Sequence, residues 1–385
     1  MSRPWAGRCK PLDTSLRKEF RSAEITDEPH PEALLGRLVD RLRAEEFAQY
    51  LEGATVLITG AAGFLGSRLA ERVAESGATR LVLVDSAEGP LVDLVARSRS
   101  EWGSTDAVPV LADIRSPARA IDVVARYRPH IVFHAAAYKH VPLVQANPIE
   151  GVATNVLGTK NMVEASRAIG VERFVLFSSD KAVRPRNVLG QTKAAAEWIV
   201  AAAGDHVPGS RYSSIRLANV LDATGGILRC FRRQIQHGGP LTVTDPRATR
   251  LLMTSTEAVA LALVGAAIGD SSSALWLDVD PPVRIVDIAR KLADGHEIDT
   301  QFIGLRQGEN LEERSFSDGN ETSATRCEGV LKTALPRVDS VWLDAWTAEV
   351  TEFVERASDE EVRRALDAVY ALAEREPVAL AGAIG

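Results

Sequence analysis

The sequence predicts an α/β protein built on a doubly wound parallel sheet, with a smaller C-terminal domain beside it. The first observation is an alternation, because short apolar runs of strand length are each followed by a helical pattern in successive units. The second is that several runs stop abruptly at glycine, small or polar residues, as at the ligand-binding carboxyl edge of an open parallel sheet. The expected strands lie at 56–58, 81–84, 108–111, 131–133, 174–177 and 213–217.

The composition is that of a globular chain of 385 residues, 45% of them apolar, with a net charge of −7. This charge argues against nucleic acid or an anionic membrane as a partner, since both require a concentrated basic surface. The three cysteines are widely spaced and form no CxxC pair, so neither a disulfide framework nor a metal site is expected. The longest apolar run, 259–268, is too short to span a bilayer, and no signal sequence is recognisable. We therefore expect a soluble, cytoplasmic protein without membrane insertion.

The first expected strand runs into a glycine-rich turn. Gly60, Gly63 and Gly66 follow it, a helix is expected to start at Gly66, and the second strand ends in Asp85. Glycines let the backbone approach a pyrophosphate, a helix start offers free N–H groups, and a following acid accepts hydrogen bonds from ribose. The pattern predicts a dinucleotide site, against the alternative of an ordinary tight turn. Since a carboxylate repels a 2′-phosphate and Ser86 comes next, Asp85 favours NAD over NADP.

The loops after the third and fourth strands carry further candidates. Asp113 is placed to touch an adenine edge, although a solvated loop aspartate fits almost equally well. The small residues 135–137 leave room for a cofactor, and the next three residues, Tyr138, Lys139 and His140, are expected to point into the cleft.

For both histidines near this loop, His134 and His140, a structural role with hydrogen bonds is at least an equal alternative. In the helix expected at 151–170, Asn155 is expected to brace the neighbouring strands.

The fifth strand and the helix after it form the stretch around which the chain is organised. The strand delivers Ser178, Ser179, Asp180 and Lys181 at its carboxyl end, and the helix carries Lys193. Lysines are few, eight among 45 basic residues, and only lysine readily loses its proton at accessible pH. Three of the eight fall in the segments described here, against the alternative of chance and surface placement.

Beyond residue 220 the pattern loosens into a smaller lid domain. A strand at 275–279 is expected to return to the sheet, followed by a helix at 285–292 and a polar loop at 304–313. Ser358 is a candidate cap for the last helix. The expected division is a flexible leader (1–28), a helical extension (29–52), a dinucleotide-binding domain (53–220), a substrate-binding domain (221–340) and a helical tail (341–385).

With these residues in view, the chain resembles the extended short-chain dehydrogenase/reductases, which have an NAD-binding Rossmann fold. More narrowly, residues 32–335 resemble the UDP-N-acetylglucosamine 4,6-dehydratases of capsule, flagellin-glycan and protein-glycan pathways, in a soluble form without the transmembrane helices of anchored relatives. The motifs are ALLGR (33–37), TGAAGFLG, HAAAYKHVPLVQANPIEGVATNVLGT, FSSDKAVRPRNVLGQTK, the segment from RLANVLD to GGPLTVTDPRATRLLMT, VRIVDIARKL and GLRQGENLEE.

The resemblance implies an NAD-dependent dehydratase acting on UDP-N-acetylglucosamine or a close UDP-hexose. Hydride leaves C4 of the sugar, a base removes the C5 proton, the C6 hydroxyl departs as water and hydride returns to C6. Lys181, with a lowered pKa, would be the base, and Asp180, as a protonated carboxyl, the acid. Ser179 would orient the C4 oxygen, and Lys193 would hold the nicotinamide ribose.

The resemblance also implies the remaining contacts. Paired arginines suit the oxygens of the substrate diphosphate, no metal is expected, and relatives assemble as homo-oligomers. The expected cofactor contacts are Gly60, Gly63, Phe64, Leu65, Gly66, Asp85, Asp113, Ile114, Ala135, Ala136, Ala137, Asn155, Ser178 and Lys193, and the expected substrate contacts are Lys139, His140, Asn187, Asn219, Thr242, Arg250, Arg306 and Glu309.

Two departures from the family pattern leave alternatives open. The superfamily tyrosine that deprotonates the substrate hydroxyl is replaced by Leu189, which transfers no proton. The glycine turn reads Gly-Phe-Leu-Gly before Arg68 where the branch has Gly-Ser-Ile-Gly-Ser-Glu. A C4 or C5 epimerase on the same scaffold, or a catalytically silent nucleotide-binding protein, are the alternatives.

Overall fold

The computed structural model describes residues 31–39, 42–204, 209–279, 281–294, 296–313 and 322–373. The expected leader at 1–28 lies outside these residues, as does the end of the expected tail.

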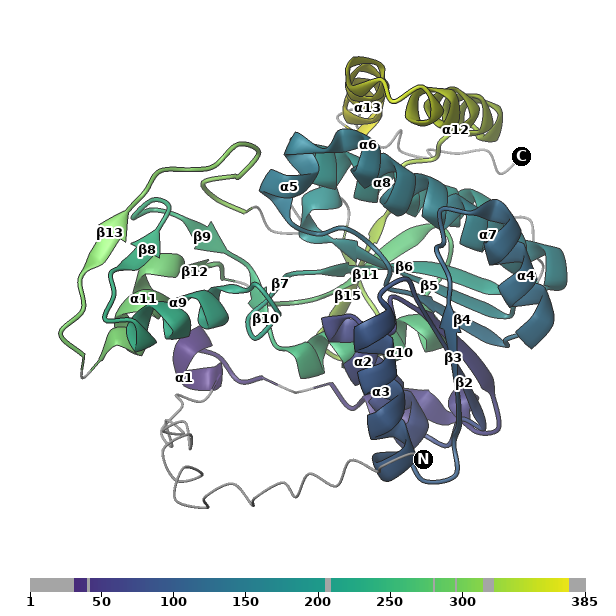
Figure 1. Ribbon diagram of the computed structural model, residues 1–385, viewed down its shortest axis with the longest axis horizontal. Coiled ribbons are helices and arrows are strands. Elements are labelled where there is room, and N and C mark those ends of the chain that lie inside the picture. The colour runs from purple at the N-terminus through teal and green to yellow at the C-terminus, as the bar shows by residue number, and fades with distance from the viewer. Residues whose placement is uncertain are drawn as a thin grey trace, which may run out of the picture.

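Within the described residues, the core is a nine-stranded sheet with the order β14-β15-β11-β6-β5-β4-β1-β2-β3 (Figure 1). Seven strands, from β11 to β3, are parallel, which confirms the predicted doubly wound sheet. The two strands at the other edge, β15 and β14, are antiparallel and were not expected. The strands are β1 Thr55–Thr59, β2 Arg80–Asp85, β3 Asp106–Leu111, β4 Ile131–His134, β5 Arg173–Ser179, β6 Arg211–Leu217, β11 Ser273–Leu277, β14 Thr322–Ala324 and β15 Val330–Ala334.

Helices cover both faces of this sheet because its strands are apolar on both sides (Figure 1). In β1, Val56 and Ile58 belong to the core on one face and Leu57 to the core on the other. One face carries α2 Phe64–Glu75, α3 Glu88–Glu101, α10 Ser255–Ile268 and the 3₁₀ segment η2 Ala44–Leu51; the other carries α4 Pro117–Tyr127, α5 Val141–Ala146, α6 Pro148–Val152, α7 Gly158–Ile169 and α8 Val188–Gly204.

The longest apolar run of the sequence lies in α10, which is buried along nearly its whole length between the sheet and η2. Its start is fixed by a capping box, in which the Thr254 side chain accepts from the Glu257 backbone and the Glu257 side chain accepts from the Thr254 backbone. Across the described residues, every helix is too short or too polar to cross a membrane.

The smaller domain consists of short strand pairs and helices with their own apolar core. Its elements are β7 Asn219–Val220 with β10 Leu252–Met253, β8 Leu241–Val243 with β13 Thr300–Phe302, β9 Thr249–Arg250 with β12 Val283–Arg284, and the helices α9 Ile227–Gln236 and α11 Ile285–Ala293. The range expected to form this domain, 221–340, is in fact divided, because α10, β11, β14 and β15 pack with the large sheet.

The N-terminal extension contacts both the smaller domain and the helices that pack on the large sheet. Of the helices expected in it, α1 Pro31–Leu35 has only five residues and η2 is a 3₁₀ helix. Between them, Arg37 donates to both carboxylate oxygens of Glu257, at 2.7 and 2.9 Å, and to the carbonyl of Leu252 at 2.9 Å. Lys291, on α11, donates to two carbonyls of α1.

Three further segments refine the sequence expectations. The helix expected at 151–170 is interrupted by a π segment, η3 Ala153–Leu157. The tail forms two helices, α12 Ser340–Glu355 and α13 Asp359–Ala373, which pack outside α6 and α8 (Figure 1). Ser358 immediately precedes α13.

Candidate active site

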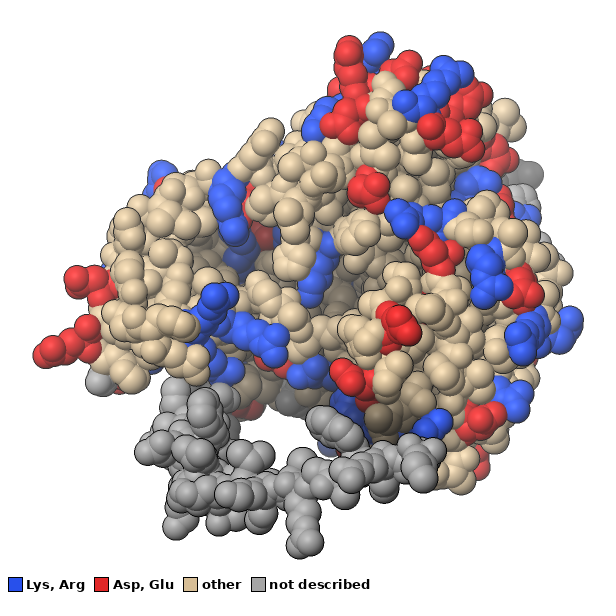
Figure 2. Space-filling view, in the orientation of Figure 1, with Lys and Arg blue, Asp and Glu red and all other residues tan. Residues whose placement is uncertain are grey.

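A cleft of about 1920 Å³, counting the solvent at its mouth, lies between the carboxyl ends of the parallel strands and the smaller domain. Figure 2 shows this hollow, with lysine and arginine side chains around it. Its wall includes the glycine turn, the loop after β4, the end of β5, the segment after β6 and the polar loop that ends at residue 313. Ligands bind at this edge of open α/β sheets.

The glycine turn is packed so closely that its glycines cannot be replaced without movement. A Cβ on Gly66 would lie 2.1 Å from the carbonyl oxygen of Gly60, and a Cβ on Gly60 would lie 2.8 Å from the backbone of Ala136. The helix α2 begins at Phe64, with Gly63 as its N-cap, so the expected start at Gly66 is two residues late. The backbone N–H groups of a first turn have no partner within the helix, and here that turn lines the cleft.

The two acids expected at the cofactor lie beside the cleft and not on its wall. Asp85 accepts from the backbone N–H of Ala62 and of Ala87, both at 2.9 Å, and so holds the glycine turn. Asp113 forms an ion pair with Arg115 at 2.6 Å, which lowers the pKa of its carboxyl. Its neighbour Ile114 is buried in the core.

The loop after β4 is anchored by buried side chains. His134 lies between the hydroxyls of Thr59 at 2.8 Å and Thr159 at 3.0 Å, and burial lowers its pKa to about 3. This is the structural role that the sequence left open. Asn155, 1% exposed, binds the backbone N–H and carbonyl of Tyr138, and therefore shapes the loop from behind and does not reach the cleft.

The polar residues of this loop lie on the cleft wall. Lys139 donates to the carbonyl of Thr224 at 3.3 Å, across the mouth of the cleft, and burial lowers the pKa of its ammonium. His140 lies against Gly225, and burial together with the charges of Lys139 and Arg306 lowers its pKa. Ala135 and Ala137 line the cleft, whereas Ala136 packs against the glycine turn.

At the end of β5 a buried cluster of charged side chains forms part of the cleft wall. The ammonium of Lys181 lies 3.0 Å from Asp180, 2.8 Å from Glu313 and 3.2 Å from the side-chain oxygen of Asn219. Ser179 donates to Asp180 at 2.7 Å, and Asn219 donates to Glu313. The side chains of Asp180 and Glu313 are each 4% exposed and that of Lys181 is 14% exposed. The structure thus brings the three predicted catalytic residues together and adds a second carboxyl.

The proton distribution in this cluster differs from the one expected. Burial by itself lowers the pKa of Lys181, but the carboxylates of Asp180 and Glu313 outweigh it and hold the pKa above its usual value. Burial raises the pKa of Asp180, yet the charge of Lys181 and hydrogen bonds bring it below its usual value. The pKa of Lys181 is therefore raised and that of Asp180 lowered, the reverse of the directions expected from the sequence, and the roles of the two residues in turnover stay predictions. Burial and the charge of Asp180 raise the pKa of Glu313 to about 8.

Behind the cluster, α8 supplies a second buried group. Lys193 donates to the carbonyl of Phe177 at 2.9 Å, and burial lowers its pKa to about 8. One turn further on, Glu197 forms a two-point ion pair with Arg216, at 3.0 and 2.8 Å, and accepts from the Ser178 hydroxyl. These groups fix Lys193 and Ser178 at the cleft wall.

The expected substrate residues are distributed around the smaller domain. Asn187 bridges the start of α8 to the carbonyl of Gly308 at 2.9 Å. Arg306 pairs with Glu309 at 2.6 Å. Arg250 lies 3.5 Å from Glu313, and its guanidinium lines the cleft. Thr242 lies on β8, bonded to Gln234, away from the cleft wall.

Residues 56–334 match a family of polysaccharide biosynthesis proteins. The chain belongs to this family. Its parallel sheet and glycine turn are those of the extended short-chain dehydrogenase/reductases, as predicted from the sequence. The chain is 36% identical to the capsular polysaccharide biosynthesis protein CapD of Staphylococcus aureus, over 73% of this chain and 48% of that protein. It therefore spans about half the length of such curated relatives.

Two other relatives of this chain have names that state an enzyme activity. The UDP-glucose 4-epimerase of Rickettsia rickettsii is 32% identical over 66% of this chain and 75% of that protein. The inverting UDP-N-acetylglucosamine 4,6-dehydratase of Campylobacter jejuni is 29% identical over 69% of this chain and 78% of that protein. Together they place the chain among relatives of nucleotide-sugar dehydratases and epimerases.

Solved structures show the same fold. Pen from Bacillus thuringiensis superposes with a TM-score of 0.69 at 25% identity, covering 75% of this chain and 92% of that one. MoeE5, solved in complex with UDP-glucuronic acid and NAD, has a TM-score of 0.57 at 24% identity, covering 67% of this chain and 88% of that one.

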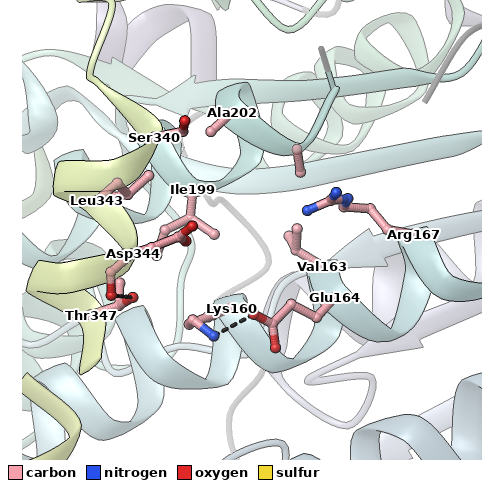
Figure 3. Close-up of a pocket in the computed structure, with 11 residues that line it drawn as sticks. Lys160, Val163, Glu164, Arg167, Ile199, Ala202, Ser340, Leu343, Asp344 and Thr347 are labelled. Atoms are coloured by element: carbon pink, nitrogen blue, oxygen red, sulfur yellow. Dashed lines mark hydrogen bonds and ion pairs between the residues drawn. The ribbon is translucent and has the colours of Figure 1, made fainter. Parts of the chain in front are cut away.

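A second, smaller pocket lies between α7, α8 and α12 (Figure 3). Two pairs of residues in its lining interact with each other, since Lys160 pairs with Glu164 and Thr347 donates to the carbonyl of Asp344. We assign no ligand to it. Among the described residues, no cluster of three or more His, Cys, Asp or Glu side chains is arranged to hold a metal ion.

Sequence reasoning missed three residues of the site, Glu313, Glu197 and Arg216. Glu197 carried a usable signal, because it is a lone carboxylate in an otherwise apolar helix segment, four residues after Lys193. Glu313 carried no such signal, because it follows Glu312 in a polar loop and nothing in the sequence shows which of the two glutamates is buried.

Proposed function

We propose that this protein is an NAD-dependent nucleotide-sugar 4,6-dehydratase acting on UDP-N-acetylglucosamine or a close UDP-hexose. The observation that carries the proposal is the buried cluster of Asp180, Lys181 and Glu313, which holds both acidic and basic groups on the wall of the cleft that the glycine turn also lines. The relative from Campylobacter jejuni, which bears this enzyme name, supports the choice of reaction and substrate.

The glycine turn fits a dinucleotide cofactor. The first turn of α2 presents N–H groups suited to a pyrophosphate, Asp85 stands at the end of β2, and Lys193 lies on the wall where a nicotinamide ribose would be held. The NAD reported with MoeE5 supports this cofactor. When bound, NAD would supply the acceptor for a hydride from sugar C4 and return that hydride at C6.

The substrate fits the remainder of the cleft. Arg250 and Arg306 are on its wall and carry the guanidinium groups suited to a diphosphate. Lys139 and His140 line the side next to the glycine turn. The UDP-sugars bound to MoeE5 are of this class.

The chain's own residues would then move protons. Ser179 orients the C4 oxygen, and the ammonium of Lys181 stabilises the negative charge that develops on the oxidised sugar. Asp180, held as a carboxylate by Lys181, is the group ready to accept the C5 proton. Leu189, buried at the wall, transfers no proton, so the C4 hydroxyl proton must leave through a neighbouring group.

The test is incubation of the protein with NAD and UDP-N-acetylglucosamine, followed by mass spectrometry. We expect a product lighter by one water, and we expect Asp180→Asn and Lys181→Met to abolish its formation while cofactor binding persists. Unchanged turnover in both variants, or no dehydrated product from any UDP-hexose tried, would refute the proposal.

The alternative with specific support is C4 epimerisation, because the Rickettsia rickettsii relative bears that name. It needs oxidation at C4 and reduction from the other face, without elimination. A product of unchanged mass that co-elutes with the 4-epimer would establish it. A silent nucleotide-binding protein would bind NAD and give neither product. Homo-oligomer formation stays a prediction.

A further inference from the structure

Arg37, in the segment between α1 and η2, is held where the smaller domain meets α10. Its guanidinium donates to both carboxylate oxygens of Glu257, at 2.7 and 2.9 Å, and to the carbonyl of Leu252 at 2.9 Å. The side chain of Arg37 is 18% exposed and that of Glu257 is 2% exposed. Among the described residues that line the cleft, Arg37 is absent. An effect of Arg37 on the site must therefore pass through the residues that it holds.

The position of Arg37 is fixed from both sides along the chain. Leu34 and Leu35, in α1, are buried in the core of the smaller domain. Leu42, which follows Arg37, is buried in a core of the large sheet. The guanidinium is therefore presented to β10 and α10 from a stretch of chain that is anchored at each end.

The strand that Arg37 contacts, β10, has only two residues and pairs with β7. On that side, the carbonyl of Leu251 accepts from the backbone N–H of Asn219 at 3.0 Å. Successive carbonyls of a strand point to opposite edges, so the carbonyl of Leu252 faces away from β7 and toward Arg37. The guanidinium thus takes the place of a neighbouring strand at this carbonyl.

The segment 249–253 presents two groups to the candidate site. The side chain of Arg250 lines the cleft, where we expect it to bind the substrate diphosphate. The carbonyl of Leu251 also accepts from the side chain of Asn219, at 3.3 Å, and the side-chain oxygen of Asn219 accepts from the ammonium of Lys181 at 3.2 Å. A displacement of this segment would therefore move a substrate contact and a contact of the ammonium together.

Arg37 also balances the charge of Glu257, whose side chain belongs to the capping box of α10. A buried carboxylate that loses its partner destabilises a fold strongly. Removing Arg37 therefore has two separable consequences. One is a loss of stability through the unpaired Glu257, and the other is the loss of the hydrogen bond to Leu252.

We propose that Arg37 is a positioning residue for the candidate active site. Through the peptide of Leu252 it holds the segment 249–253 so that Arg250 and Asn219 face the bound UDP-sugar. The inference rests on the proposed function for its ligand class. Its effect falls on the substrate side of the cleft, because the glycine turn that suits NAD is held by none of these hydrogen bonds.

The experiment compares wild type with Arg37→Met and with a double variant that carries Arg37→Met and Glu257→Gln. In the double variant no carboxylate is left unpaired, and the new amide oxygen can still cap α10. The matched control is Arg43→Met, because this side chain of the same extension is 82% exposed. We measure the affinity for UDP with NAD present, the affinity for NAD alone, and the urea midpoint, and then the rate of dehydration of UDP-N-acetylglucosamine.

We expect both Arg37 variants to bind UDP about tenfold more weakly, the loss of roughly one hydrogen bond to a charged group. Their affinity for NAD should stay within about twofold of wild type. The urea midpoint should fall in Arg37→Met and recover in the double variant, whereas the affinity for UDP should not recover. The rate of dehydration should fall by about tenfold or more in both, because the contacts of Lys181 are displaced.

An affinity for UDP in the double variant within about twofold of wild type would overturn the inference, because Arg37 would then act on stability alone. An equal loss of affinity for NAD would overturn it as well. If the variants show the defect in UDP binding but the wild-type protein dehydrates no UDP-hexose, the proposed function falls and the positioning role stands. Failure of the wild-type protein to bind UDP would refute both.

Discussion

Replacing Glu197 by glutamine is expected to destabilise the protein by about 3 kcal/mol, because it leaves a buried guanidinium without its counter-charge. Glu197 is 1% exposed and Arg216 5% exposed, and they share two hydrogen bonds of 2.8 and 3.0 Å. The third guanidinium nitrogen, Nη1 of Arg216, is buried without a hydrogen-bond partner. It therefore offers no contact that could compensate for the lost charge of Glu197. A cost of about 3 kcal/mol lowers the folding constant by more than 100-fold.

The measurement is urea unfolding followed by tryptophan fluorescence. Removing both charges, with Glu197→Leu and Arg216→Met together, should cost less than Glu197→Gln alone, because no unpaired charge remains in the core. The control is Asp122→Asn, which breaks the ion pair of Arg119 at the surface, where the side chains are 48% and 54% exposed; it should cost less than about 1 kcal/mol. A cost below about 1 kcal/mol for Glu197→Gln, or a cost of the double variant at least as large as that of Glu197→Gln, would refute this account.

Two further predictions concern the cofactor turn and acid stability. Gly66→Ala should weaken NAD binding at least about tenfold in a fluorescence titration, since its Cβ would lie 2.1 Å from the Gly60 carbonyl oxygen. The control is Gly89→Ala, whose Cβ has no atom within 4 Å. Equal NAD affinities of the two variants would contradict the prediction. His134 has a pKa lowered to about 3, so the unfolded state binds one more proton than the folded state between that value and its ordinary pKa. Its contribution to stability is therefore lost as pH falls through this window, and His134→Gln should show a shallower decline of the urea midpoint from pH 6 to pH 4; an identical slope would count against it.

The parallel sheet was predictable because its strands are apolar on both faces and alternate with helices, a signal that needs no tertiary information. The antiparallel edge was not. The strand β14 has three residues, Thr322–Ala324, without apolar alternation, and it forms only because β15 offers an edge beside β11. The start of helix α2 was placed two residues late, because glycines in a turn and in a first helical turn look alike in sequence.

In the candidate site, the sequence predicted which side chains lie close together, but it did not predict the directions of their pKa shifts. The strand end delivers Ser179, Asp180 and Lys181 as neighbours, so their meeting is dictated by the chain itself. Their pKa values depend on Glu313, which comes from a loop more than one hundred residues later and is indistinguishable in sequence from Glu312. Burial opposes both shifts, the charges of Asp180 and Lys181 on each other outweigh it, and Glu313 adds to their effect.

The hydrogen bonds of Arg37 with Glu257 and Leu252 are connected to the candidate site. Its guanidinium grips the peptide of Leu252, and the preceding peptide, that of Leu251, receives hydrogen bonds from both the backbone and the side chain of Asn219. Asn219 in turn touches the ammonium of Lys181. A short series of hydrogen bonds therefore connects Arg37, in the segment between α1 and η2, to the ammonium of Lys181 at the cleft wall.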